Sequence, residues 1–337
     1  MKILNIGDMH LGVKADDPWI QNIQRLGILN AINISAQLGI KTWIQYGDVF
    51  DVRKHITHST MEFARELFDT IEANGISLHV LVGNHDMTFK NKINPNAVTE
   101  LLARHKNITI YDRPKTVEFD GVFFDIIPWM CEENTSEILE HIKTSSADYC
   151  CGHWELNGFY FYKGMKSHGL EPDFLKKYKK VYSGHFHTIS EAANVKYIGT
   201  PWTLTAGDEN DPRGFTIFDT ETETTQFIEN PVMWHKRITY PCDSIKVEDY
   251  RNLSVRLIAT EIDAGLTKLE SKLESVVHEL RVVSKVDFES TEETEEIIES
   301  MSTSNMIENY IDGLDVSDDD KIAAKTLAKS LLVEVSK

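Results

Sequence analysis

One pattern repeats in the first third of the chain: a short apolar run, a polar loop and an amphipathic helix. The apolar runs occupy residues 2–6, 42–46 and 76–82, and helical spacing of apolar residues follows over 17–39, 57–73 and 95–104. Asp17 and Pro18 mark the beginning of the first helix, and Gly39 marks its end. Because parallel strands need crossover connections, this order predicts an α/β fold with a parallel, helix-covered sheet.

The sequence pattern changes after residue 107, where the apolar runs become short and typical of β-strands. They occupy residues 108–111, 115–119, 122–127, 148–151, 181–183, 195–198, 215–218 and 225–228. This series predicts a second sheet packed on the first, giving two β-sheets flanked by helices over residues 1–230. A small α/β cap domain is expected over 231–285, with a strand at 254–260 and a helix at 266–280.

The C-terminal part is acidic. Residues 286–320 contain thirteen Asp and Glu and no Lys or Arg, and without them the formal net charge of −18 falls to −5. A mildly acidic body can still bind phosphate through basic loops and metal ions. We expect a linker at 286–300, whose apolar content is too low to pack alone. A helical segment at 301–337 is expected to be too small to fold alone and to dock on a partner.

Other classes of protein are disfavoured. No apolar run approaches the ~20 residues that a membrane-spanning helix needs, and no signal-peptide core precedes the first strand. We therefore expect a cytoplasmic protein without membrane contact. The cysteines show no paired metal spacing and are expected to be reduced core thiols: Cys131, Cys150, Cys151 and Cys242.

Metal-ligating residue types follow five of the apolar runs. In chain order they are Asp8 and His10, Asp48, Asn84 and His85, His153, and His185 with His187. Nitrogen and oxygen donors of this kind suit Mn, Fe or Zn rather than Ca. Each group alone has an ordinary explanation, such as a turn at residues 83–86, a core imidazole at 153 or a surface histidine at 187. Five groups at strand ends make those explanations improbable and predict two divalent metal sites.

The same motifs carry a family resemblance. Asp-x-His, Gly-Asp-x-x-Asp, Gly-Asn-His-Asp, Gly-His and Gly-His-x-His, in this order, resemble the five motifs of the calcineurin-like metallophosphoesterases. Residues 47–53 and 197–201 further resemble the SbcD-type double-strand-break repair nucleases. The whole chain, including residues 125–134, is similar to the recombination nuclease subunits of T-even-like bacteriophages, which would place it in the host bacterial cytoplasm.

The resemblance implies a role for each motif residue. One metal would be held by Asp8, His10 and His187, the other by Asn84, His153 and His185, with Asp48 bridging both. Mn²⁺ is the expected ion, and Mg²⁺ is the alternative. His85 would be a catalytic residue free of the metals, able to stabilise a nonbridging oxygen or protonate the departing sugar oxygen. Asp51 is the second catalytic candidate; it would either orient His85 or support its loop, and support is the favoured role. Asp86 is interpreted as an orienting or turn residue rather than a ligand.

The resemblance also implies a substrate and partners. DNA, at duplex ends or single-stranded regions, would be contacted by basic residues that otherwise read as a solvated face: Arg53, Lys54, Lys90, Lys92, Lys163 and Lys166. A coiled-coil ATPase of the SbcC type would bind the 301–337 segment, within a heterotetramer built on a homodimer of this chain. The cap would orient DNA for exo- and endonuclease action in end processing, recombination, replication and repair.

Two other functions remain open from the residues alone. A small-molecule phosphatase or cyclic-nucleotide phosphodiesterase would use the same metals, but it would have no obvious use for a cap and a docking segment. A catalytically silent scaffold of the same fold is the second alternative, and the complete ligand set argues against it.

Overall fold

The computed structural model describes residues 1–162, 165–209, 211–231 and 233–284. All of these residues except Met165 fall in one compact unit. The predicted linker at 286–300, the helical segment at 301–337 and Lys163 lie outside the described residues.

The first sheet contains the predicted parallel strands. β1 (Lys2–Ile6), β2 (Thr42–Gln45), β3 (Ser77–Leu81) and β6 (Ile108–Tyr111) run parallel to one another. Two later strands, β15 (Gly214–Asp219) and β16 (Thr224–Glu229), continue the sheet antiparallel on the other side of β1. The prediction that the segments at 108–111, 215–218 and 225–228 belong to the second sheet is therefore wrong. A β-type run shows its alternation but not its neighbours, and β1 still had an edge to pair.

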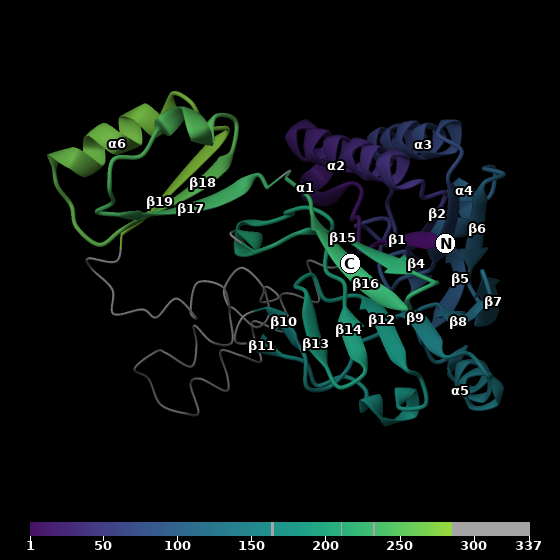
Figure 1. The fold of residues 1–337 in the computed structure, drawn as a ribbon. Coiled ribbons are helices and arrows are strands. Elements are labelled where there is room, and N and C mark those ends of the chain that lie inside the picture. The colour runs from purple at the N-terminus through teal and green to yellow at the C-terminus, as the bar shows by residue number, and fades with distance from the viewer. Residues whose placement is uncertain (163–164, 210, 232, 285–337) are drawn as a thin grey trace, which may run out of the picture. The chain divides into compact units, whose positions relative to one another are not determined.

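Helices cover the outer face of this sheet. α2 (Pro18–Leu38) and α3 (His58–Ala73) lie side by side (Figure 1), and α4 (Ala97–Leu102) follows later in the chain. The Asp17 side chain accepts the Trp19 N–H at the start of α2, and Gly39 ends the helix at φ 68°. A short segment, α1 (Val13–Asp16), precedes α2, and its residues Lys14 and Ala15 are left-handed.

The predicted helix at 95–104 begins later than expected. Its first residues form the second strand of a hairpin, β4 (Met87–Phe89) with β5 (Lys92–Asn96). The helix begins only at Ala97, where the Asn96 side chain accepts the Thr99 N–H at 2.8 Å. Asn96 is thus the N-cap that the apolar spacing alone did not reveal.

The second sheet packs on the first. Its order is β13–β14–β12–β9–β8–β7. The strands are β7 (Lys115–Phe119), β8 (Val122–Ile127), β9 (Tyr149–His153), β12 (Lys180–Gly184), β13 (Ser190–Ala192) and β14 (Val195–Tyr197). β8, β9, β12 and β14 are parallel neighbours. Helix α5 (Thr135–Thr144) covers the outer face through Ile138 and Ile142, completing four layers. The loops of the body also contain short elements: β10 (Tyr160–Tyr162), β11 (Met165–Lys166), η1 (Pro172–Leu175) and η2 (Ala206–Asp208). A further one, η3 (Val247–Tyr250), lies in the cap.

The cap is a parallel three-stranded sheet with one helix. Its elements are β17 (His235–Tyr240), β18 (Ser254–Ala259), α6 (Ala264–Glu274) and β19 (Glu279–Ser284). The predicted helix at 266–280 therefore ends early, because its last residues turn into β19. Leu273 and Leu280 still contact the same small core, one from the helix and one from the strand, which explains why their spacing imitated a single helix.

The remaining composition-based expectations are partly met. Cys131, Cys150 and Cys151 are buried free thiols, but Cys242 is exposed, so its assignment to the core was wrong. It lies just beyond the end of β17, outside the cap core. Within the described ranges, the longest apolar helical stretch falls short of what a membrane crossing requires.

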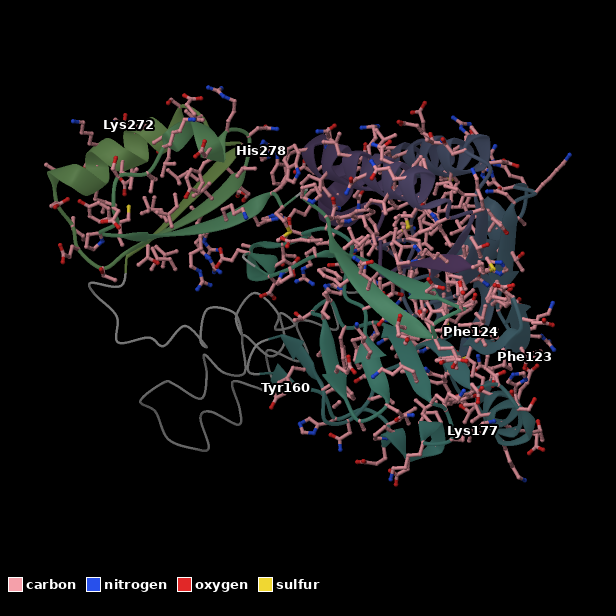
Figure 2. The ribbon with its side chains drawn as sticks, in the orientation of Figure 1. Phe123, Phe124, Tyr160, Lys177, Lys272 and His278 are labelled. Atoms are coloured by element: carbon pink, nitrogen blue, oxygen red, sulfur yellow. The ribbon has the colours of Figure 1, made fainter. Side chains whose placement is uncertain are left out.

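Two neighbouring phenylalanines on β8 offer a matched test of the core between the sheets. Phe124 is 1% exposed and packs against Phe119, Tyr149 and Phe218, with ring centroids 5.0–5.6 Å apart for the contacts in this group, whereas Phe123 is 45% exposed (Figure 2). We expect Phe124→Ala to lower the free energy of unfolding by about 3–5 kcal/mol, and Phe123→Ala by less than about 1 kcal/mol. Urea denaturation of both variants measures the difference, and equal losses would contradict this assignment of the core.

Candidate metal centre

Five polar loops meet where parallel strands of both sheets end. β1, β2 and β3 lead into the loops that carry Asp8 and His10, Asp48 and Asp51, and Asn84 and His85. β9 ends at His153, and β12 leads directly into His185 and His187. The carboxyl edge of parallel strands is where ligand sites of α/β proteins form. All seven predicted metal ligands come together here, Asp8, His10, Asp48, Asn84 and His153 buried and His185 and His187 partly buried.

The ligand atoms form two groups. In the first, Asp8, His10 and His187 place one donor atom each within 4.8 Å of one another. His10 Nε2 and His187 Nε2 are 3.0 Å apart. Two facing imidazole nitrogens at this distance need either a shared proton or a cation between them. The donor set therefore fits a divalent ion.

The second group gives a sharper test. Asp48, His153 and His185 place their donor atoms within 4.8 Å of one another, and Asn84 Oδ1 lies 2.9 Å from His153 Nε2 and 3.1 Å from His185 Nδ1. In this orientation the Asn84 oxygen faces only acceptors. A cation among these atoms satisfies them, and otherwise the amide turns over to donate. This group also fits a divalent ion, with Asn84 as a neutral ligand.

The other ring nitrogens of three histidines are oriented by the protein. His153 Nδ1 is 2.6 Å from the Tyr46 carbonyl oxygen, and His10 Nδ1 is 3.1 Å from Asp51 Oδ1. His185 Nε2 is 3.7 Å from Glu155 Oε2. Such partners turn the opposite nitrogen toward the metal and raise its basicity. Sequence reasoning missed Glu155, although its position two residues after a strand-end histidine was a usable signal.

Burial and neighbouring charges shift the pKa values of the acidic and basic side chains in the centre. Burial would lower the pKa of His153, but Asp48 and Asp8 outweigh it and raise that pKa to about 9. Burial likewise opposes protonation of His10, whose pKa is raised to about 9 by Asp51, Asp48 and Asp8. The pKa of Asp48 lies well below its ordinary value because His153 overcomes the effect of burial. Protons on the two histidines thus occupy positions that cations would take.

His85 is held beside the ligand groups. Its Nδ1 is 2.6 Å from the main-chain oxygen of Asp51, and its ring centroid is 5.1 Å from that of His10. The main-chain N–H of His85 donates to Asp48 Oδ1 at 2.7 Å. With Nδ1 engaged, proton transfer would use Nε2. Asp51 contacts His85 through its carbonyl oxygen and His10 through its carboxylate, an arrangement that corresponds to orienting these rings rather than to the loop support favoured from the sequence.

Asp86 joins two of the ligand loops. It is fully buried and accepts the N–H groups of Phe50 and Gly83 at 3.0 and 2.9 Å. Gly83 itself must be a glycine, because a Cβ atom there would lie 2.3 Å from Asp48 Oδ1. Asp86 therefore orients the loop that presents Asn84 and His85.

The basic residues proposed for DNA binding are placed unequally. Arg53 Nη2 lies 3.1 Å from the side-chain amide of Asn84, at the centre itself. Lys54, Lys90 and Lys92 are exposed, Lys163 is outside the described residues and Lys166 is on β11. A further group of lysines near the start of β12 pairs with local acids or carbonyl groups, at the opposite end of that strand from His185: Lys176, Lys177, Lys179 and Lys180.

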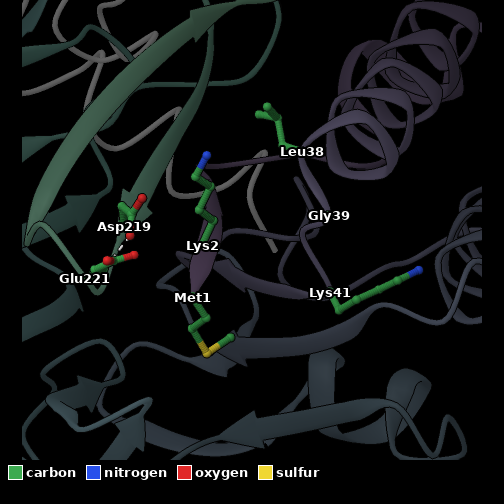
Figure 3. Close-up of a pocket in the computed structure, with 7 residues that line it drawn as sticks. All are labelled: Met1, Lys2, Leu38, Gly39, Lys41, Asp219 and Glu221. Carbon is green, nitrogen blue, oxygen red and sulfur yellow. Dashed lines mark hydrogen bonds between the residues drawn. The ribbon is translucent and has the colours of Figure 1, made fainter.

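A surface pocket elsewhere does not belong to this centre. It has a volume of about 430 Å³ and is lined by Met1, Lys2, Leu38, Gly39, Lys41, Asp219 and Glu221 (Figure 3). Lys2 begins β1, whereas the metal-ligand loop follows the other end of that strand.

The fold and the centre define a phosphoesterase. The sequence model of the calcineurin-like phosphoesterases matches residues 1–189, and the chain belongs to this family. Family membership implies divalent metal ions. The chain is 64% identical to exonuclease subunit 1 of Enterobacteria phage T4 over 338 residues, covering 100% of both proteins. Among solved structures it is similar to GAP50, the anchor in the inner membrane complex of Plasmodium, with a TM-score of 0.43 and 12% identity over 69% of this chain and 90% of that one.

The raised histidine pKa values predict the pH dependence of metal binding. Below about pH 9, a cation must displace protons from His10 and His153. The affinity of the metal-free protein for Mn²⁺ should therefore increase from pH 6 to pH 9, by up to about tenfold per pH unit for each proton displaced. Calorimetry in buffers of different ionisation enthalpy measures both affinity and proton release.

A second histidine cluster provides the control. Asp69, Glu72 and His105 also lie within 4.8 Å of one another, away from the strand ends. His105→Gln should leave the number of bound Mn²⁺ ions and their pH dependence unchanged. An affinity that does not vary with pH would contradict the proposed ligand set.

Proposed function

We propose that this protein is a two-metal DNA nuclease that hydrolyses phosphodiester bonds as exonuclease and endonuclease. One observation carries the proposal: two metal-ligand groups lie beside a histidine, His85, whose Nδ1 is tied to the Asp51 carbonyl 2.6 Å away. The relative that shares 64% identity over the full length is named an exonuclease subunit, which favours DNA as the substrate.

The roles of the ligands follow from their grouping. Asp8, His10 and His187 would hold one ion, and Asn84, His153 and His185 the other. Asp48 would bridge them, because a carboxylate can offer one oxygen to each of two ions about 3.5–4 Å apart. When bound, such a pair activates water and neutralises charge on the phosphate, and Mn²⁺ or Mg²⁺ would serve. His85 would protonate the departing sugar oxygen through Nε2 or stabilise a nonbridging oxygen.

Arg53 is the best-supported substrate contact. Its guanidinium reaches the Asn84 side chain, and in the orientation that suits a cation the Asn84 amide directs its own N–H groups, not its oxygen, toward Arg53. Arg53 would then need a new acceptor, which a substrate phosphate supplies. The β4–β5 hairpin, which directly follows the Asn84 loop, adds exposed Lys90 and Lys92 and the half-exposed ring of Phe89, suited to phosphates and an unpaired base.

The partner assignment rests on the relative and on the family resemblance. The T4 relative is named a subunit, which implies a complex. We propose a coiled-coil ATPase of the SbcC type as partner, bound through residues 301–337, with two copies of this chain in a heterotetramer. The complex would act in the bacterial cytoplasm during DNA end processing, recombination and repair, and residues 231–285 would orient the DNA.

Removal of His85 tests the reaction. Wild-type protein should release nucleotides from linear duplex DNA in the presence of Mn²⁺. His85→Ala should bind the same number of Mn²⁺ ions but lose about 10²–10⁴-fold in rate, the usual contribution of a general acid. Exposed His58, at the first residue of α3, provides the control: His58→Ala should cleave DNA normally.

The same assay separates the competing functions. Hydrolysis of a bis-aryl phosphate without cleavage of DNA, even with the ATPase present, would indicate a small-molecule phosphodiesterase. Binding of Mn²⁺ without hydrolysis of either substrate would indicate a silent scaffold. Full activity of purified His85→Ala would remove His85 from the mechanism.

Truncation after residue 285 tests the partner assignment. The shortened chain keeps every described ligand residue, so its Mn²⁺-dependent hydrolysis of a bis-aryl phosphate should stay within about twofold of the full chain. It should no longer co-purify with the ATPase. Retention of the ATPase by the truncated chain would refute docking through the C-terminal segment.

A further inference from the structure

One loop joins the metal centre to the cap. It comprises residues 199–209, between the last strand of the second sheet and the return to β15, and we name it the coupling loop. Its first part is bonded to a predicted metal ligand: the Thr200 N–H donates to the His187 main-chain oxygen at 3.0 Å. A Cβ atom at Gly199 would lie 2.8 Å from that same oxygen. The loop therefore packs directly on the backbone of His187.

The coupling loop is internally braced. Asp208 Oδ2 accepts the N–H groups of Leu204 and Thr205 at 2.8 and 2.9 Å. Its other oxygen accepts from Arg213 at 2.7 Å, and both side chains of this ion pair are almost fully buried. These contacts hold residues 204–209 in one conformation.

The far end of the loop holds the cap. Glu209, whose side chain is 2% exposed, pairs with Arg237 on β17 and with Arg256 on β18. Arg256 is 5% exposed and approaches both carboxylate oxygens, with Nε 3.2 Å from Oε2. The Thr203 hydroxyl oxygen also accepts the main-chain N–H of Trp234, which directly precedes β17, at 3.2 Å. One buried carboxylate thus binds two strands of the cap sheet.

A second contact between cap and body is aromatic. Trp19, at the start of α2, stacks on His278 with ring centroids 4.4 Å apart and an interplanar angle of 8°. Its indole N–H donates to the Asn252 main-chain oxygen at 2.9 Å. This contact holds Trp19 against the cap through one ring stack and one hydrogen bond between uncharged partners. The contacts of the Glu209 carboxylate with two guanidinium groups restrict the orientation of the cap more tightly than this ring stack does.

We propose that Glu209 is a positioning residue that holds the cap at a fixed angle to the metal centre, so that duplex DNA bound across both is aligned for cleavage. This inference rests on the proposed nuclease function. Small phosphodiesters, which need only the metal centre, do not depend on Glu209. Glu209 therefore affects cleavage of long substrates through the cap and does not touch the reacting phosphate.

Glu209→Gln tests this role by retaining shape while removing the charge. We expect kcat/KM on linear duplex DNA to fall at least tenfold, with hydrolysis of a bis-aryl phosphate and Mn²⁺ binding within twofold of wild type. Glu248→Gln is the matched control, because Glu248 pairs with Arg251 within the cap. Arg237→Gln, which removes the more exposed of the two arginines, should give an intermediate loss on duplex DNA only.

A distance measurement in the full chain keeps the test independent of activity. Cys242 is an exposed cysteine of the cap, and the other three cysteines are buried. Spin labels at Cys242 and at Lys143→Cys, exposed on α5, report the position of the cap relative to the body. The distance distribution should broaden or shift in Glu209→Gln and remain as in wild type in Glu248→Gln.

The outcomes separate the two proposals. An unchanged distance distribution, or equal losses on DNA and on the bis-aryl phosphate, would overturn the positioning role of Glu209. Failure of the wild-type protein to cleave DNA would overturn the nuclease proposal and the alignment of DNA with it, whereas the distance change would still support Glu209 as the residue that fixes the cap.

Discussion

The metal centre depends on Asp48, a buried carboxylate that joins four of the five ligand loops. Its main-chain oxygen accepts the N–H groups of Met9 and His10, both at 3.0 Å. The Asp48 side chain accepts the main-chain N–H of His85, and its Oδ2 lies 3.2 Å from His153 Nε2. Burial of a carboxylate is costly unless it is paired, so the cationic or metal-bound environment and the fold of these loops stabilise each other. The fifth loop is attached through Asp8, which accepts the His185 N–H at 2.9 Å.

Three of the predicted ligands have a strained backbone conformation. His10, Asp48 and His185 all have left-handed φ angles, of 48°, 51° and 84°. Such conformations cost about 1–3 kcal/mol each for residues other than glycine and persist only when surrounding contacts impose them. Each of these residues is a predicted ligand supplied by a different strand, and two of the strands belong to one sheet and the third to the other. The core between the sheets therefore sets the distances within the centre as well as the stability of the fold.

The convergence of the motif residues was easier to predict from the sequence than the membership of the strands in each sheet. Asp17, Pro18 and Gly39 specify α2 locally, so its ends could be read directly. Membership of β15 in the first sheet depends on pairing with β1, more than two hundred residues earlier, which alternation cannot encode. The motif residues could be collected because parallel strands bring their ends together. Sequence reasoning did not identify Glu155 and Glu209 because each acts through a neighbouring side chain. No sequence motif marks a carboxylate whose partner is a histidine ring or a distant arginine.

The buried pairing of Glu209 also explains why the cap is not attached by an apolar patch alone. Replacing a buried ion pair with well-packed apolar side chains is often neutral or favourable for stability, so stability is a weak reason for this one. Control of the orientation of the cap is a stronger reason for the ion pair, because Arg237 and Arg256 approach one carboxylate from two neighbouring strands. A shift of the cap by one side-chain width would separate the buried Glu209 carboxylate from its guanidinium partners, whereas the Trp19 contacts involve only neutral groups and a ring stack. The ion pair thus makes displaced cap positions unfavourable, and the coupling loop that supplies Glu209 is also hydrogen-bonded to the backbone of His187.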